Sequence, residues 1–150
     1  MSTKKEIVVC TRLDDVCLSK LSKLRDTIPL EGARIHLVHC WELKAYSYDF
    51  MNVYYPDADQ TGELVNSIKS VLNDQKGTIL GEGNNSSEFV TTVLQSTSPK
   101  YELLQYIKKV NADLTVTVTP EKHGVSGLFH SSFTDYLAIH SPTDILVIRE

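Results

Sequence analysis

The period at which apolar residues recur switches repeatedly along this chain of 150 residues. Short, nearly continuous apolar runs are typical of parallel strands covered on both faces, and they alternate here with segments of helical periodicity. Five strands are predicted, at 6–11, 33–41, 89–95, 113–118 and 144–150. Such alternation predicts a single α/β domain, residues 1–150, built on one doubly wound parallel sheet with helices on both faces.

Four helices are predicted between these strands. Their expected positions are about 14–29, from 59 onward, 98–110 and 133–140. Asp14 and Asp15 suit the start of the first helix, because acidic groups stabilise a helix N-terminus. Ser98 as the N-cap and Pro99 at the first helical position mark the start of the third helix.

Two connecting segments carry no clear period. We expect a loop at 81–87 and an irregular segment at 42–57. Aromatic residues are concentrated in the segment 41–55, which begins at Trp41 and includes four tyrosines. Three interpretations remain open for this segment: a loop packed on its own domain, a surface for a protein partner, or a lid over a ligand.

Composition argues against several classes of partner. The net charge of −4, with dispersed basic residues, gives no reason to expect nucleic acid or an anionic membrane as a partner. No apolar run approaches the roughly 20 residues that span a bilayer, and the N-terminal apolar run is too short for a signal peptide. The three cysteines lack metal-ligand spacing, which suits a reducing cytoplasm.

In a doubly wound sheet, ligands bind in the crevice beyond the carboxyl ends of the strands. Arg12 follows the first strand and is expected at this crevice, with Asp14 and Asp15 just beyond it. An acidic pair here is also found in phospho-acceptor receiver domains. Those domains need an aspartate at the end of the third strand and a lysine at the end of the fifth. The corresponding segments of this chain, "VLQSTS" and "LVIRE", contain neither residue, which argues against a receiver domain.

The connection after the fourth strand, "TPEKHGVSGLFHSSFTDYL" (119–137), leads into a helix. A helix N-terminus attracts anions, because its first N–H groups are unpaired and its dipole is positive there. Ser131 or Ser132 is well placed to cap that helix. A phosphate cradle also needs glycines, since any Cβ keeps phosphate oxygens away from the backbone amides.

The segment "ARIHLVHCWEL" (33–43) and the ending "NADLTVTVTPEKHGVSGLFHSSFTDYLAIHSPTDILVIRE" (111–150) resemble the universal stress protein family. The resemblance extends over essentially the whole chain. It implies the strand order 3-2-1-4-5, counting the five strands along the chain. It also implies an edge position for the last strand, where a second subunit commonly pairs.

Nucleotide-binding members of that family carry a motif of three glycines followed by serine or threonine. Laid on this chain, the motif keeps Ser132, whereas its glycines fall on Val118, Glu121 and Ser131. The family's acidic residue at the end of the first strand, which faces the nucleoside, falls on Arg12. The resemblance therefore implies a degenerate pocket that binds no ATP and no other cofactor.

Other residues of chemical interest are expected to be structural. Cys40 ends the second strand beside Cys10 and borders the degenerate pocket, and both thiols are predicted to be core residues. His36, His39 and His140 are expected to pack or to form hydrogen bonds locally. No nucleophile elbow, Walker loop or metal-ligand spacing is present, so the chain is not expected to be an enzyme.

These observations predict a non-catalytic, cytoplasmic stress-response protein. It is expected to form a homodimer through residues 144–150, with a further candidate partner surface at the aromatic segment 41–55. A regulatory switch that binds ATP, AMP or a signalling nucleotide in a rearranged pocket is the alternative. An enzyme such as a nucleotide hydrolase has the least support.

Overall fold

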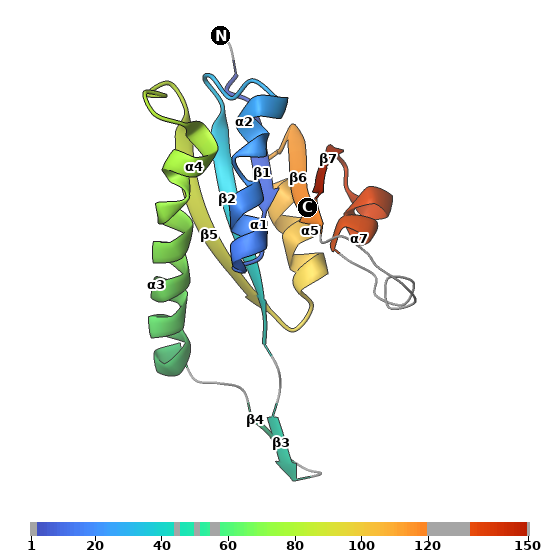
Figure 1. Ribbon diagram of the computed structural model, residues 1–150. Helices are drawn as coiled ribbons and strands as arrows, with labels where there is room; N and C mark the ends of the chain where they lie inside the picture. The colour runs from blue at the N-terminus through green and yellow to red at the C-terminus, as the bar shows by residue number, and fades with distance from the viewer. Residues whose placement is uncertain (1–2, 44–45, 50–51, 55–57, 120–132, 150) are drawn as a thin grey trace.

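A five-stranded, all-parallel sheet in the order β5-β2-β1-β6-β7 forms the centre of the molecule (Figure 1). The structure is a computed structural model that describes residues 3–43, 46–49, 52–54, 58–119 and 133–149. The strands are β1 (Glu6–Cys10), β2 (Arg34–Glu42), β5 (Glu88–Ser96), β6 (Leu114–Thr119) and β7 (Asp144–Arg149). Both the predicted parallel α/β fold and the strand order 3-2-1-4-5 are confirmed.

Helices cover both faces of this sheet (Figure 1). They are α1 (Asp15–Lys20), α2 (Lys23–Thr27), α3 (Ala58–Asp74), α4 (Lys76–Leu80), α5 (Pro99–Lys109) and α7 (Phe133–His140). The predicted start of the third helix is confirmed, since Ser98 is the N-cap of α5 and Pro99 follows it. That helix ends before Asn111, which has a φ of 51° and so adopts the left-handed conformation that terminates helices.

Two predicted helices are each divided in the structure. The first prediction, about 14–29, corresponds to α1 and α2, which are separated at Leu21 and Ser22. The second corresponds to α3 and α4, which are separated at Gln75. Apolar spacing did not reveal the first break, because Leu21 and Leu24 are both fully buried and the apolar stripe of the helix continues across it.

The prediction that 42–57 is irregular was wrong. Strand β2 continues through Glu42, and a short antiparallel hairpin follows, formed by β3 (Tyr46–Asp49) and β4 (Asn52–Tyr54). In Figure 1 this hairpin extends beyond the end of the main sheet. The alternation of aromatic and polar residues in "YSYD" is a strand signal, although the segment as a whole carries no regular period.

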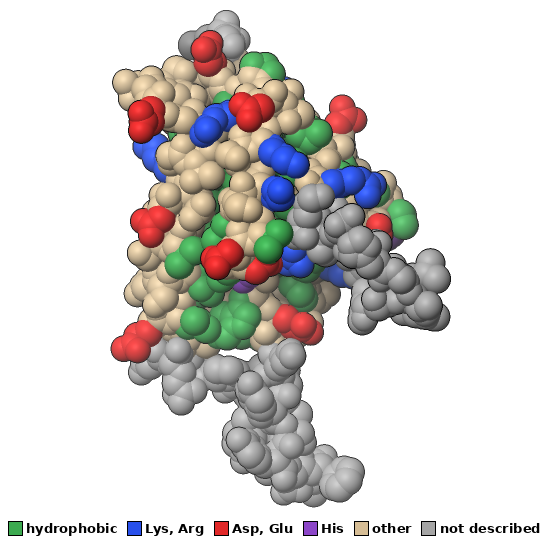
Figure 2. Space-filling view, viewed as in Figure 1, with side chains coloured by type: hydrophobic (Ala, Val, Ile, Leu, Met, Phe, Trp, Pro, Cys, Tyr) green, Lys and Arg blue, Asp and Glu red, His purple; other side chains and the backbone are tan. Residues whose placement is uncertain are grey.

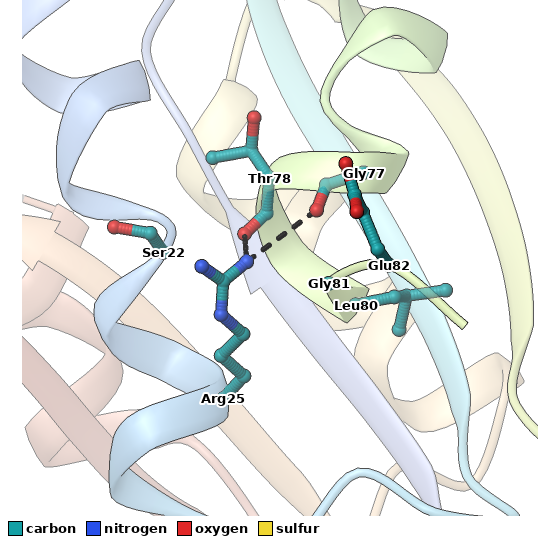
Figure 3. A pocket seen from close by; sticks show the side chains of 7 residues that line it. All are labelled: Ser22, Arg25, Gly77, Thr78, Leu80, Gly81 and Glu82. Atoms are coloured by element: carbon teal, nitrogen blue, oxygen red, sulfur yellow. Dashed lines mark hydrogen bonds between the residues drawn. The ribbon is translucent and has the colours of Figure 1, made fainter. Parts of the chain in front are cut away.

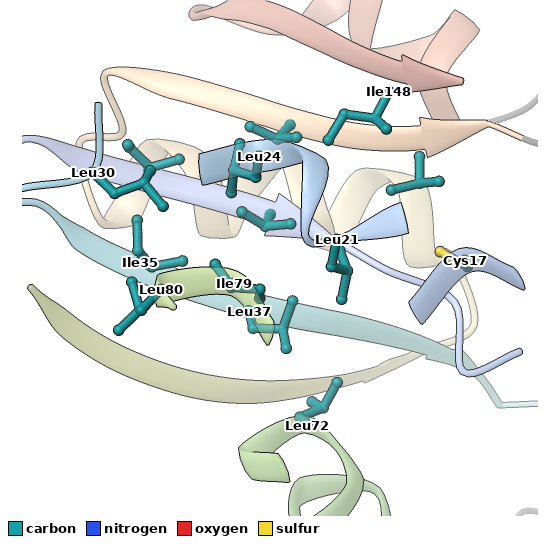
Figure 4. Packing of buried hydrophobic residues seen from close by; sticks show 14 of the residues in the cluster. Cys17, Leu21, Leu24, Leu30, Ile35, Leu37, Leu72, Ile79, Leu80 and Ile148 are labelled. Atoms are coloured by element: carbon teal, nitrogen blue, oxygen red, sulfur yellow. The ribbon is translucent and has the colours of Figure 1, made fainter. Parts of the chain in front are cut away.

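Alternating side chains of the strands build two separate cores, one on each face. The larger core lies under α1, α2, α3 and α4 and includes Leu21, Leu24, Leu72 and Ile79 (Figure 4). The smaller lies under α5 and α7; its fully or almost fully buried members are Val8, Val38, Leu103, Ile107 and Leu137. No helix among the described residues is both long enough and apolar enough to cross a bilayer.

Candidate functional site

The carboxyl ends of β1, β2 and β6 lie side by side at one end of the sheet, as the parallel pairing requires. The chain leaving β1 is held in place there by several hydrogen bonds. Thr11 is 3% exposed, its N–H donates to Val38 O at 3.0 Å, and its hydroxyl lies 3.3 Å from Cys17 Sγ. Asp14 caps α1, since its Oδ1 accepts from Cys17 N–H at 2.8 Å.

Arg12 lies at this carboxyl end of the sheet, two residues after the last residue of β1, as predicted. Its Nε forms an ion pair with Asp14 Oδ2 at 3.1 Å, and both side chains are nearly half exposed. An exposed pair of this kind stabilises by only about 0–1 kcal/mol.

His39 on β2 supports the backbone at the same end of the sheet. Its Nδ1–H donates to the carbonyl oxygen of Thr11 at 3.0 Å, because a carbonyl can only accept. The expectation of local hydrogen bonding is confirmed for His39, and His140 packs against Tyr136 with the rings tilted and their centroids 4.6 Å apart.

Cys10 and Cys40 meet on the opposite face of these strands. Cys10 pairs with Val38, which places Cys40 diagonally across from it. Both thiols are free and pack against the smaller core, as predicted.

The environment of Cys10 keeps its thiol protonated. A hydrogen bond with Cys40 and burial raise the pKa of Cys10 well above its usual range. Since the thiolate is the reactive form, this favours a structural thiol over a nucleophile or redox centre. Among the residues that the structure describes, no group of three or more His, Cys, Asp or Glu is arranged to hold a metal ion.

Val118, the first of the three lost glycine positions, lies on β6 beside Ile148 of β7. Its side chain is 8% exposed and belongs to the larger core, so it points into the protein interior and not into the crevice. Glu121, Ser131 and Ser132 fall outside the described part of the chain. The structure thus brings Arg12, Cys40 and Val118 to the carboxyl end of the sheet. The remaining predicted positions stay untested.

A groove of about 740 Å³ lies between α2 and α4, toward the opposite end of the sheet (Figure 3). Arg25 lines it and donates from Nη1 to the carbonyl of Thr78 at 2.7 Å and, more weakly, to that of Gly77 at 3.4 Å. The guanidinium thus satisfies carbonyls of the short helix α4, which favours a packing role. Sequence reasoning did not identify this groove.

The face that carries α1 and α3 shows acidic and basic side chains interspersed (Figure 2). Apolar side chains gather between these two helices in the same view. A nucleic-acid surface instead concentrates positive charge over a continuous patch, so the charges on this face do not favour nucleic-acid binding.

A family model for the universal stress protein family matches residues 4–149. A universal stress protein solved in complex with cAMP is similar at a TM-score of 0.65 and 19% identity, over 99% of this chain and 98% of that chain. No curated protein matches the chain.

Two further solved structures show the same fold. The universal stress protein UspA from Lactobacillus plantarum is similar at a TM-score of 0.63 and 16% identity, covering 99% of this chain and 100% of that chain. A universal stress protein family member from Arabidopsis thaliana with AMP bound is similar at a TM-score of 0.59 and 11% identity, over 97% and 92% of the two chains.

Proposed function

The chain belongs to the universal stress protein family, and we propose that it is a non-catalytic, cytoplasmic stress-response protein that acts by association and does not hold ATP. The position of Arg12 is the observation that carries this proposal. It stands at the end of β1, where nucleotide-binding relatives are expected to present an acid to the nucleoside. A carboxylate accepts hydrogen bonds from hydroxyl and amino groups, whereas a guanidinium can only donate.

The phosphate end of the pocket supports the same proposal. The lost glycine positions Glu121 and Ser131 carry side chains where a triphosphate must approach bare backbone. A carboxylate about 4 Å from a phosphate charge repels it by about 4 kcal/mol at an effective dielectric of 20. A micromolar complex has only about −8 kcal/mol of binding free energy, so little ATP affinity remains.

The test restores the family pattern. Titration calorimetry with ATP and magnesium is expected to show no binding by the natural chain at millimolar nucleotide. The variant Arg12→Asp, Glu121→Gly, Ser131→Gly is expected to bind measurably. Val118→Gly is added last, because removing a buried core side chain costs stability in its own right.

A matched control retains Arg12 and changes only positions 121 and 131. It separates loss of the phosphate contacts from loss of the nucleoside contact. Tight ATP binding by the natural chain would refute the proposal. A restored variant that folds and still binds nothing would show that the lost glycines are not the cause.

The alternative function is a switch that binds AMP or a signalling nucleotide. It is favoured by similar structures that contain cAMP, AMP and, in Archaeoglobus fulgidus, dAMP. A monophosphate makes fewer backbone contacts than a triphosphate and depends less on the missing glycines. The same calorimetry with AMP and cAMP separates the two functions, since binding of either at micromolar concentration supports the switch.

The association we propose is a homodimer through residues 144–150. Strand β7 is an edge strand that, in the part of the chain described, pairs only with β6. A second copy would continue the sheet by pairing with its free side. Deletion of these residues is expected to give monomer or aggregate, and an unchanged dimer would refute this interface.

A partner protein at the aromatic segment 41–55 is the second part of the proposed association. The β3–β4 hairpin lies within this segment, and a two-stranded hairpin alone is at best marginally stable in water. Contact with another protein would stabilise it. A pull-down that compares the natural chain with a variant lacking the tyrosines of 46–55 tests this, and equal recovery of partners would contradict it.

A further inference from the structure

Strand β5 forms the edge of the sheet opposite β7 (Figure 1, Figure 4). In a parallel strand, each residue turns its N–H and C=O to one side, and successive residues alternate sides. Glu88 N–H donates to Ala33 O and Ser96 O accepts from Leu43 N–H, both at 2.9 Å, so the even-numbered residues face β2. The residues that turn their backbone groups outward are Phe89, Thr91, Val93 and Gln95.

Beyond Glu88, the sequence of β5 carries none of the residues by which proteins usually prevent pairing at such a position, and the structural element beside this edge is α3 (Figure 1). Residues 89–96 contain no charged residue, proline or glycine. The single charged residue of the strand, Glu88, is already paired with Arg34 Nε at 2.5 Å. Strand β5 is also the longer of the two edge strands, with nine residues against six in β7.

We propose that β5 pairs antiparallel with β5 of a second copy of this chain, about a two-fold axis at Thr92. In this register Thr91 lies opposite Val93 of the second copy, and Phe89 lies opposite Gln95. All four are outward-facing residues, so each opposed pair exchanges two backbone hydrogen bonds. The backbone groups left open at this edge are thereby satisfied.

The side chains of β5 are complementary to themselves in that register. Thr92 meets Thr92 of the second copy, and Val90 meets Leu94, which are pairs that stabilise antiparallel strands. Val90 is 37% exposed in the single chain although it is apolar, and this contact covers it. No two like charges are opposed.

Helix α3 contacts β5 through side chains. Asn73 Oδ1 accepts from the Thr91 hydroxyl at 3.1 Å. That bond engages the Thr91 side chain, whereas the Thr91 backbone N–H has no partner among the described residues. The pairing we propose uses this backbone group and leaves the contact with α3 in place.

The substitution Thr91→Pro tests the pairing selectively. The Thr91 N–H takes no part in the ladder with β2, so proline removes an outward donor and leaves the internal sheet bonded. The control Thr91→Ala loses the same hydroxyl contact with Asn73 and keeps the N–H. Sedimentation equilibrium is expected to show self-association weakened at least about tenfold in the proline variant relative to the alanine variant.

Amide hydrogen exchange of the natural chain gives a measurement that does not depend on whether the proline variant folds. Exchange at Thr91 and Val93 is expected to slow by at least about tenfold between low and high micromolar concentration. Slowing confined to β7 amides would support the proposed dimer and overturn this inference. Equal association of the two Thr91 variants, or β5 amides protected only when another protein is added, would overturn it as well.

Discussion

On the face covered by α1 to α4, the core cluster consists of aliphatic side chains and one cysteine, whereas the face under α5 and α7 also carries a connected chain of polar side chains. On the second face His36 Nε2–H donates to Glu6 Oε2 at 2.6 Å, and its Nδ1 shares a hydrogen bond with the Tyr106 hydroxyl at 2.9 Å. The Tyr106 oxygen lies 3.0 Å from the hydroxyl of Thr92, which completes the chain of bonds.

This difference shows how one sheet can combine two kinds of stabilisation. Apolar contacts are non-directional, so the first face gains free energy in proportion to the surface that it buries. Hydrogen bonds need defined geometry, so the second face fixes α5 at one position relative to β1, β2 and β5. Two threonine pairs add to that face, Thr115 with Thr143 and Thr117 with Thr134, each at 2.8 Å.

The largest expected effect comes from deleting a buried leucine on each face. Leu24→Ala is expected to lower the free energy of unfolding by about 3–5 kcal/mol, because the large cluster around it cannot collapse into the cavity. Leu137→Ala is expected to cost about 2–3 kcal/mol, because α7 packs on a smaller cluster and can settle inward. Urea denaturation measures both, and equal or reversed costs would remove the contrast.

A smaller effect is expected from the polar chain. Tyr106→Phe removes the hydroxyl that both His36 Nδ1 and the Thr92 hydroxyl bond, which is expected to cost about 1–3 kcal/mol. Tyr101→Phe is the matched control, because Tyr101 on the same helix is 54% exposed and should change stability by less than about 0.5 kcal/mol. If both variants unfold at the same urea concentration, the network contributes nothing measurable.

The smallest effect is expected at alkaline pH. The pKa of Cys10 is raised in the folded protein, so between the unfolded and folded pKa values the folded state holds more protons than the unfolded state. This thiol's contribution to stability is therefore present below the ordinary cysteine pKa of about 8.5 and is lost as pH rises through the folded pKa. Cys10→Ala is expected to show a shallower loss of stability above that pH in urea denaturation, and identical slopes would contradict this.

Regular periodicity made most of this fold predictable. The start of α5 at Pro99 and the strand β6 followed directly from the sequence, because local propensity and tertiary burial agree at both. The break at Leu21 could not be predicted in this way, since a turn that keeps leucines buried leaves the apolar spacing unchanged. The polar chain was also missed, because Tyr106 and Glu6 are far apart in sequence and only the strand order brings them together.

The candidate site was predictable in position and only partly in detail. Strand order places Arg12, Cys40 and Val118 at the carboxyl end of the sheet, as expected from parallel pairing. The orientation of Val118 toward the core depends on its alternation along β6, which a motif comparison does not consider. Steric exclusion of a nucleotide is therefore expected to come from Glu121 and Ser131.

Because every strand of the main sheet runs in the same direction, the two termini of the chain emerge at opposite poles. Strand β1 begins at Glu6 at the amino pole, and β7 ends at Arg149 at the pole where Arg12 lies. An affinity tag or fluorophore fused after β7 would sit next to both the crevice and the proposed dimer edge. Labels attached ahead of β1 are therefore the appropriate choice for every titration and association measurement on this protein.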